Sequence, residues 1–191
     1  MSRDQIVSLA GDVVDAARRL LGCYLVRTID GRRLVGKIVE TEAYHQTDAA
    51  SHSYRGKTPR TEVMFGPSGR AYVYFTYGRH YCMNVVTGPE GEGSAVLIRA
   101  LEPIEGQELM RLNRAGFLDR ELANGPAKLC QALQINAQYN GHNLSELPLQ
   151  LAINSPINPT DIIATTRVGI RRDRERLWRF YIRGSDYISR P

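Results

Sequence analysis

The sequence predicts a single α+β domain over residues 1–191, built on a mostly antiparallel β-sheet with helices around it. Three observations predict this class. Segments with the apolar alternation of strands are interspersed with segments of helical periodicity, and most successive strands are close enough in sequence to form hairpins. No repeat, linker or low-complexity tract divides the chain, and 42% hydrophobic residues are enough for one core.

A helix and a β-hairpin are expected at the start of the chain. Asp12 can cap a helix whose apolar residues follow helical spacing, and Gly22 ends that helix. Strands over 23–28 and 33–44 flank Asp30-Gly31. This dipeptide is favoured in tight hairpins because both central residues of the turn need a positive φ.

A long polar loop and a three-stranded meander are expected next. Residues 45–70 are rich in Gly, Pro, Ser and Thr without sustained periodicity, and loops of this length within a domain are usually functional or disordered. Strands are predicted over 71–77, 81–87 and 94–101. Leu101-Glu102-Pro103 is expected to end this part of the sheet.

The last part of the chain predicts two helices and two short strands. The helices cover 105–115 and 126–133, and Pro126 fits a first helical position because the missing amide hydrogen has no partner there. The strands cover 149–152 and 179–183. An arginine-rich stretch leads into the second of these strands and contains Arg167, Arg171, Arg172, Arg174, Arg176 and Arg179.

The charge of the chain favours a polyanionic partner. The formal charge is +5, and all 25 basic residues except Lys37, Lys57 and Lys128 are arginines, which suit bidentate phosphate contacts. A polar segment over 1–5 and the lack of any stretch of about 18 apolar residues predict a soluble, intracellular protein, in the cytoplasm or nucleoid if bacterial. The three cysteines lack metal-ligand spacing and are expected to be buried thiols.

Tyrosine is concentrated in one short segment. Four of the 10 tyrosines lie within residues 72–81. On a strand, Tyr72 and Tyr74 share a face, whereas Tyr77 lies beside Gly78 at the following turn and projects as a single ring. Rings with a polar tip suit a surface that stacks on planar ligands, and nucleobases are the commonest planar ligands of a basic protein.

Two carboxylates on one strand are candidates for chemistry. Strand alternation places Glu40, Glu42 and Tyr44 on one face, where a glutamate is exposed, paired with a cation, or reactive in a cleft. The residues alone leave these alternatives open. Arg99 follows the apolar residues 95–98, and it should meet a carboxylate or a phosphate because burying an unpaired charge is costly.

Seven segments of the chain, taken in order, carry a common resemblance. They are Val39-Glu40-Thr41-Glu42-Ala43-Tyr44, Ser51-His52-Ser53, Thr58-Pro59-Arg60, Tyr72-Val73-Tyr74 through Tyr77-Gly78, Cys82-Met83-Asn84, Arg99-Ala100-Leu101-Glu102-Pro103 and Gly125 through Leu133. Together they resemble the alkyladenine (3-methyladenine) DNA glycosylase family. The implied fold has a curved antiparallel sheet with surrounding helices, like the C-terminal domain of methionyl-tRNA formyltransferase.

The resemblance implies a monofunctional DNA glycosylase that initiates base excision repair. Such an enzyme flips a damaged purine out of duplex DNA and hydrolyses its N-glycosidic bond. The implied substrates are 3-methyladenine, 7-methylguanine, hypoxanthine and ethenoadenine, which the sequence does not rank. None of the lysines stands among the pocket residues to form a Schiff base, so no lyase activity is expected. No metal or other cofactor is implied, and one lesion requires only a monomer.

The resemblance also implies the roles of individual residues. Glu42 matches the general base that activates water, and Arg99 helps to position that water. Only register with the family motif favours Glu42 over Glu40. Tyr77 matches the ring that is wedged into the duplex. The base pocket matches Tyr44, His52, Tyr74 and Asn84, and Asn84 would discriminate against the amino group of guanine.

Candidates for the DNA backbone are Arg60, Arg79 and Lys128. Arg79 departs from the apolar residue that relatives more often carry after the wedge turn, which leaves open whether it contacts the opposite strand or a phosphate. Without the resemblance, His52 is expected to be an ordinary polar residue of a loop, and the Asn84 amide is equally compatible with capping a neighbouring backbone group.

Two other functions fit parts of the sequence. The first is a non-catalytic nucleic-acid binding module, like the formyltransferase C-terminal domain. Glu42 argues against it, because a carboxylate that faces a phosphate-rich partner repels that partner. The second is an unrelated small-molecule hydrolase with Glu40 and Glu42 as paired carboxylates, which would leave the arginine excess without a purpose.

Overall fold

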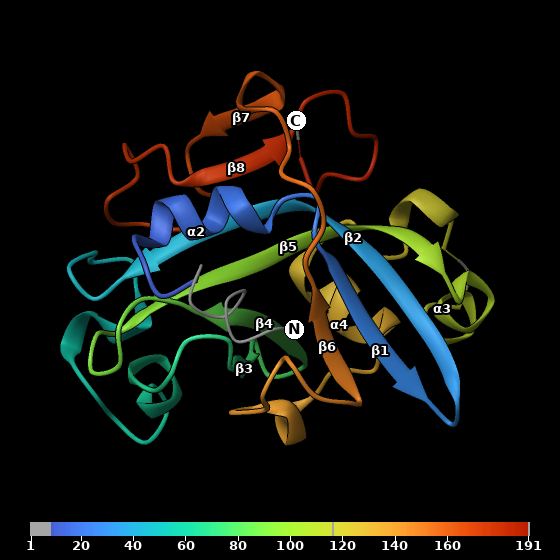
Figure 1. Cartoon of the computed structure of the whole chain (residues 1–191), viewed down its shortest axis with the longest axis horizontal. Coiled ribbons are helices and arrows are strands. Elements are labelled where there is room, and N and C mark those ends of the chain that lie inside the picture. Colours follow the sequence, from blue (N-terminus) through green and yellow to red (C-terminus); the bar gives the residue numbers. More distant parts are fainter. Residues whose placement is uncertain (1–8, 116, 191) are drawn as a thin grey trace.

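A curved antiparallel sheet organises the chain (Figure 1), and the computed structural model describes residues 9–115 and 117–190. The sheet has eight strands within these ranges: β1 Tyr24–Ile29, β2 Arg32–His45, β3 Ala71–Thr76, β4 His80–Val86, β5 Ser94–Glu105, β6 Leu149–Ala152, β7 Ile162–Thr165 and β8 Arg179–Ile182. Six follow the order β3-β4-β5-β2-β1-β6, and β8 pairs with both β2 and β7. Every pair is antiparallel, which confirms the predicted α+β class.

The helix and hairpin at the start form as predicted. The Asp12 carboxylate accepts hydrogen bonds from the amides of Val14 at 2.8 Å and Asp15 at 3.1 Å, and so caps helix α2 (Val13–Leu20). The β1–β2 hairpin turns at Asp30 and Gly31, whose φ angles are +47° and +76°. Both features depend on local chemistry, which explains why the sequence alone predicts them. The polar segment over 1–5 lies outside the described residues.

Strand β5 is longer than predicted. It continues through Pro103 to Glu105, where the sequence predicts its end at Leu101-Glu102-Pro103. Pro103 pairs with Gly36 of β2 at a register shift. A strand tolerates proline at such an irregularity, because the missing amide hydrogen interrupts no regular ladder there. The prediction was therefore wrong at this end, and helix α3 (Gln107–Asn113) begins two residues later than expected.

The remaining elements follow the predictions, and short 3-10 turns and one further strand are added to them. Helix α4 (Pro126–Ala132) begins with Pro126, and strands β6 and β8 lie where they are expected. The long polar loop contains two 3-10 turns, η1 (His52–Arg55) and η2 (Glu62–Phe65). Strand β7 was not predicted, because its four half-buried residues show no alternation and pair only with β8.

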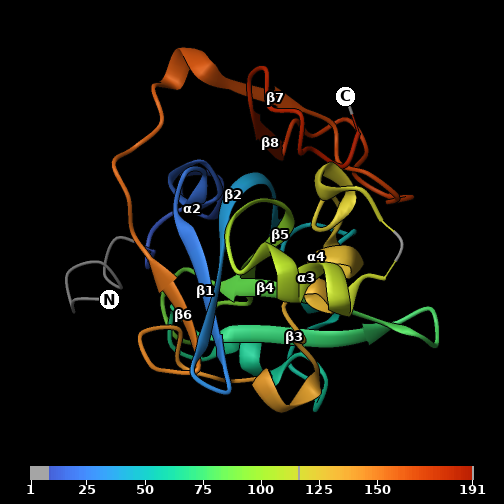
Figure 2. The ribbon, with the colours of Figure 1, turned by 90° about the vertical axis from the view of Figure 1, so that its right-hand side faces the viewer.

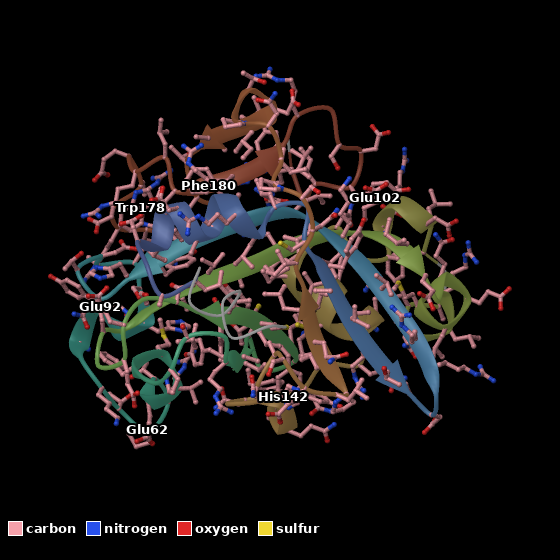
Figure 3. The ribbon with its side chains drawn as sticks, viewed as in Figure 1. Glu62, Glu92, Glu102, His142, Trp178 and Phe180 are labelled. Atoms are coloured by element: carbon pink, nitrogen blue, oxygen red, sulfur yellow. The ribbon has the colours of Figure 1, made fainter. Side chains whose placement is uncertain are left out.

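The helices cover the sheet from different sides. Helix α2 packs on β2 and β5, helix α4 packs on β4 and β5, and the two helices lie on either side of β5 (Figure 2). The Thr41 hydroxyl donates to the carbonyl of Ala17 at 2.9 Å and joins β2 to α2. Phe180 of β8 is fully buried beside α2 (Figure 3), with the Arg18 guanidinium 4.5 Å from its ring centre. The β3–β4 turn extends away from this body (Figure 2).

The likeness to the formyltransferase C-terminal domain stays a prediction. No helix in residues 9–115 and 117–190 is both long and apolar enough to cross a membrane. All three cysteines are free and buried, as the sequence predicts.

Candidate active site

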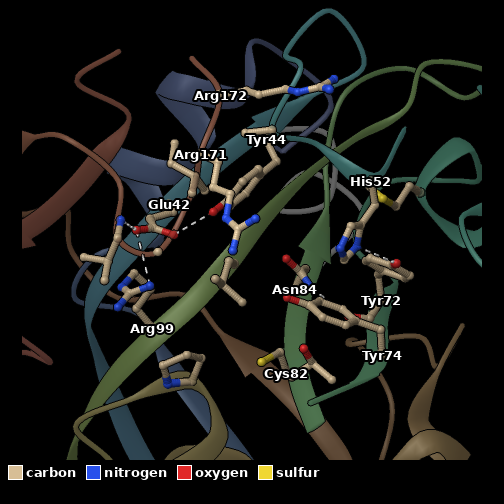
Figure 4. A pocket seen from close by; sticks show the side chains of 18 of the residues that line it. Glu42, Tyr44, His52, Tyr72, Tyr74, Cys82, Asn84, Arg99, Arg171 and Arg172 are labelled. Atoms are coloured by element: carbon tan, nitrogen blue, oxygen red, sulfur yellow. Dashed lines mark hydrogen bonds and ion pairs between the residues drawn. The ribbon is translucent and has the colours of Figure 1, made fainter. Parts of the chain in front are cut away.

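Four strands in register form one wall of a cavity of about 420 Å³ (Figure 4). Tyr72 pairs with Asn84, Asn84 pairs with Leu97, and Leu97 pairs with Glu42. Paired residues project to the same face of a sheet, so these side chains from β3, β4, β5 and β2 form a continuous row. The Asn84 amide nitrogen donates to the carbonyl of Tyr72 at 3.1 Å, which holds the Asn84 side chain in one orientation.

Seven residues singled out from the sequence line this cavity: Glu42, Tyr44, His52, Tyr74, Tyr77, Asn84 and Arg99. Three others singled out as backbone candidates do not line it: Arg60, Arg79 and Lys128. The cavity is also lined by residues without an expected role there, including Tyr72, Cys82, Pro126, Val168, Arg171 and Arg172. The long loop and the arginine-rich stretch therefore meet at the face of the central sheet.

Strand β2 is irregular where the two glutamates lie. Its pairing with β5 shifts between Ile38 and Glu40 and again between Glu40 and Thr41. Such bulges re-aim side chains and are common beside functional sites. Both carboxylates are fully buried and lie against the same residue, Arg99, with Glu42 Oε1 3.3 Å from Arg99 Nη1. Glu40 and Glu42 thus share a face, as strand alternation predicts.

The Glu42 carboxylate is held by three groups. The Tyr44 hydroxyl donates to Oε2 at 2.8 Å, the Val168 amide donates to Oε1 at 2.7 Å, and Arg99 supplies the ion pair (Figure 4). Burial raises the pKa of Glu42 above its ordinary value, and the opposing effects of Arg99, the Val168 amide and Tyr44 do not fully cancel this. A buried carboxylate at a cavity with a raised pKa is suited to accept a proton.

Glu40 has a different environment. It does not line the cavity, and its Oε1 accepts from Arg99 Nε at 2.8 Å and Arg179 Nε at 2.7 Å. Burial opposes its ionisation, but Arg99, the Ser189 amide and Arg179 together lower the pKa of Glu40 below its ordinary value. Of the alternatives left open by the sequence, Glu40 is therefore the paired carboxylate and Glu42 is the one at the cavity.

Aromatic rings line the cavity at the end of the continuous row of side chains that is farthest from Glu42. The rings of Tyr72 and Tyr74 stack with centres 5.5 Å apart, which confirms that they share a face. The His52 ring lies edge-on to Tyr74 at 4.6 Å, and its Nδ1 is 3.0 Å from the Tyr72 hydroxyl (Figure 4). Desolvation by these neighbours, with the charge of Arg60, lowers the pKa of His52 to about 4. Tyr72 also lines the cavity.

The tip of the β3–β4 hairpin presents one exposed ring. Tyr77 is 87% exposed, and its φ of +50° is uncommon for a residue with a side chain. Gly78 follows with a φ of +68°. A backbone held in the left-handed region by a residue other than glycine costs stability, and such strain is concentrated at functional sites.

Arginines surround the cavity mouth. Arg171 and Arg172 are exposed and line the cavity, and neither has a hydrogen-bond or ion-pair partner within the described ranges. The Arg60 guanidinium lies 5.5 Å from the Tyr74 ring centre. Lys128 instead donates to Asn124 Oδ1 at 2.7 Å, and Arg79 lines a separate groove with His80 and Gln134.

A buried ion pair secures the segment that supplies the Val168 amide. Arg167 Nη2 donates to Asp48 Oδ1 at 3.0 Å, and both side chains are fully buried. The Arg167 guanidinium also lies 4.7 Å from the Tyr44 ring centre. Sequence reasoning missed these contacts, since no local pattern connects an amide to a carboxylate 126 residues away. In the described part of the chain, no group of three His, Cys, Asp or Glu residues could hold a metal ion.

Comparison with known proteins defines the family. The sequence model of the methylpurine-DNA glycosylase family matches residues 8–186, and the chain belongs to this family. The chain is therefore a DNA glycosylase, a hydrolase of DNA repair whose substrate is DNA.

Three similar relatives bear the name "Putative 3-methyladenine DNA glycosylase". The protein of Carboxydothermus hydrogenoformans is 54% identical over 182 residues, which cover 95% of each chain. That of Methanoculleus marisnigri is 51% identical over 184 residues, with 94% of each chain covered. That of Francisella tularensis subsp. tularensis is 48% identical over 180 residues, with 93% of each chain covered. The resemblance read from the sequence motifs is confirmed.

Proposed function

We propose that this chain acts as a monomeric, single-domain and monofunctional glycosylase that flips damaged purines from duplex DNA into the 420 Å³ cavity and hydrolyses their N-glycosidic bond. The observation that carries the proposal is the position of Glu42. It is a fully buried carboxylate at the cavity wall, held by the Tyr44 hydroxyl, the Val168 amide and Arg99. A binding module has no need of such a group facing polyanionic DNA.

Glu42 acts as the general base in this proposal. The Glu42 carboxylate takes a proton from a water molecule while the water oxygen bonds to the anomeric carbon of the sugar. The damaged nucleobase leaves with the electron pair of the N-glycosidic bond. Such assistance contributes roughly 10²–10⁴-fold to the rate. The carboxylate also stabilises the positive charge that develops on the sugar, and Arg99 helps to position the water.

The aromatic side chains hold the extruded base. Tyr44 and Tyr74, with His52, form the stacking surfaces, which contribute roughly 1–3 kcal/mol per base. The lowered pKa of His52 supports a neutral ring at neutral pH. Asn84, fixed by the Tyr72 carbonyl, discriminates against the amino group of guanine. The proposed substrates are 3-methyladenine, 7-methylguanine, hypoxanthine and ethenoadenine.

Tyr77 fills the gap that the flipped base leaves in the duplex. Its exposure at the tip of a projecting hairpin supports this role, because a wedge must reach the base stack ahead of the protein body. Arg60 and Arg79 bind the DNA backbone. Lys128 is the weakest of the three backbone candidates, since its ammonium is engaged by Asn124.

The proposed product is a free base and an intact abasic site. A lyase needs an amine nucleophile, and no lysine of the described residues lines the cavity. The predicted function is tested by base release from duplexes with single lesions, comparing wild type, Glu42→Gln and the matched control Glu102→Gln. We expect Glu42→Gln to bind lesion DNA but lose at least about 10²-fold in rate. Undiminished release by Glu42→Gln would contradict the assignment, and strand cleavage without alkali would contradict monofunctionality.

A further inference from the structure

Glu40 is enclosed by the side chains of two arginines and by the end of the chain. Beyond the contacts with Arg99 and Arg179, its Oε2 accepts from the Ser189 amide at 2.6 Å and its Oε1 from the Ser189 hydroxyl at 2.9 Å. The same hydroxyl accepts from Arg99 Nη2 at 2.9 Å. Arg179 also donates to the carbonyl of Arg190. Ser189 therefore joins the C-terminal segment 187–190 to Glu40 and Arg99 at once.

Burial of this charged cluster costs free energy that apolar side chains in the same place would not cost. A buried ion pair is often no more stabilising than apolar residues of similar volume, because each charge loses its hydration. Here two carboxylates, Glu40 and Glu42, are buried with two guanidinium groups, Arg99 and Arg179, next to the cavity. The charges balance within the cluster, so a change in any member alters the field at Glu42.

The contacts of Arg99 show how the cluster acts. A guanidinium is planar and its donors are fixed relative to one another. Glu40 holds Nε at 2.8 Å and Ser189 holds Nη2 at 2.9 Å, and these two contacts leave Nη1 directed at Glu42 Oε1 at 3.3 Å. Fixing two donors of a rigid plane fixes the third. The orientation of Arg99 at the cavity is thus set from behind, by residues that do not line it.

We propose that Glu40 and Ser189 are positioning residues, which hold Arg99 in the orientation that presents Nη1 to Glu42. Through Ser189, the C-terminal segment 187–190 contributes to the function of the active site. This inference rests on the proposed function, in which Glu42 is the general base. It assigns Glu40 a role in the reaction although Glu40 does not line the cavity.

Replacing Glu40 should change the pH dependence of base release in a defined direction. The groups that face Glu42 are Glu40 and Tyr44 on β2, Arg99 on β5, Arg179 on β8, and Arg167 with the Val168 amide on the adjoining segment. Glu40→Gln keeps a side-chain oxygen that can accept from Arg99 Nε, but it removes the negative charge that raises the pKa of Glu42. Loss of this like charge favours the ionised form of Glu42. The acid limb of the single-turnover rate should therefore move to lower pH.

The first experiment measures the acid limb of the single-turnover rate against pH, with enzyme in excess over a DNA duplex that contains hypoxanthine. Glu102→Gln is the matched control, because Glu102 lies on β5 in a half-exposed ion pair with Lys37 at 3.5 Å. We expect the limb to move in Glu40→Gln and to stay in Glu102→Gln. A folded Glu40→Gln variant with the wild-type limb would overturn the inference, because a merely structural carboxylate changes stability and leaves the pH profile in place.

The second experiment tests Ser189 and does not depend on the folding of Glu40→Gln. Ser189→Ala removes the hydroxyl but keeps the amide, Ser189→Thr restores the hydroxyl, and Ser155→Ala is a control at an exposed serine. We expect Ser189→Ala to lower the single-turnover plateau by about 10- to 100-fold with unchanged affinity for lesion DNA. Ser189→Thr should recover most of the rate, and Ser155→Ala should match wild type. A wild-type rate in Ser189→Ala would overturn the inference.

The proposed function and this inference fail differently. No base release by wild type from any lesion would reject the proposed function and this inference with it. Release that Glu42→Gln abolishes, combined with wild-type pH limb and rate in Glu40→Gln and Ser189→Ala, would reject the inference alone.

Discussion

The Tyr44 hydroxyl donates a hydrogen bond to Glu42 Oε2 across 2.8 Å, while the Tyr44 ring lines the same cavity. The two residues are two positions apart on β2 and therefore share a face of the strand. One side chain thus links the surface proposed to stack on the base with the carboxylate proposed to activate water. Under the proposed function, placement of the base and orientation of the carboxylate are coupled through this tyrosine.

Tyr44→Phe should separate these two roles. The ring remains, so lesion binding is expected to stay close to wild type. The hydrogen bond from Tyr44 lowers the pKa of Glu42 in the wild type, and its removal should move the acid limb of base release to higher pH. Single-turnover rates across a pH series measure this shift. Tyr24→Phe should leave the limb in place, because the Tyr24 hydroxyl contacts Asn154 and Tyr24 does not line the cavity.

His52 should titrate well below the ordinary value of about 6.5 for histidine. Desolvation and the charge of Arg60 both disfavour the imidazolium and lower its pKa to about 4. Between these two values the unfolded chain binds more protons than the folded one, so His52 makes the fold less stable as the pH falls through this range. NMR titration of the ring measures the midpoint. Arg60→Ala should raise it, and a wild-type midpoint near 6.5 would contradict the prediction.

Tyr77→Ala should weaken binding to lesion duplex. The stacking energy removed amounts to roughly 1–3 kcal/mol, or about 5- to 150-fold in affinity. Fluorescence anisotropy measures binding, and 2-aminopurine beside the lesion reports on base flipping. Tyr54→Ala is the matched control, since Tyr54 is 48% exposed and does not line the cavity. Equal affinity of Tyr77→Ala and wild type would rule out the wedge.

Arg171 and Arg172 are expected to bind phosphates beside the flipped nucleotide. Both are exposed at the cavity mouth without a protein partner in the described ranges. Replacing each by alanine should reduce the slope of log affinity against log salt by about 0.9 for each phosphate that the variant no longer neutralises. Arg174→Ala serves as the control, because Arg174 is exposed but does not line the cavity. An unchanged slope in the Arg171→Ala, Arg172→Ala double variant would contradict this role.

Elements that depend on neighbouring residues could be predicted from the sequence. The Asp12 cap, the Asp30-Gly31 turn and the shared face of Glu40 and Glu42 each follow from geometry over a few residues. Pro103 misled the prediction of the end of β5, because a shift in the pairing with β2 accommodates it. Strand β7 escaped prediction because it exists only through pairing with β8.

The sequence by itself determined the fold class, the family motifs and the candidate side chains. Only the tertiary structure decided which glutamate faces the cavity, because the choice depends on the Val168 amide and on Ser189, which lie 126 and 149 residues from their carboxylate partners. It also divided the arginines into buried partners of carboxylates, such as Arg99 and Arg179, and exposed ones at the cavity mouth. Burial and charge pairing are properties of distant contacts, and local sequence does not encode them.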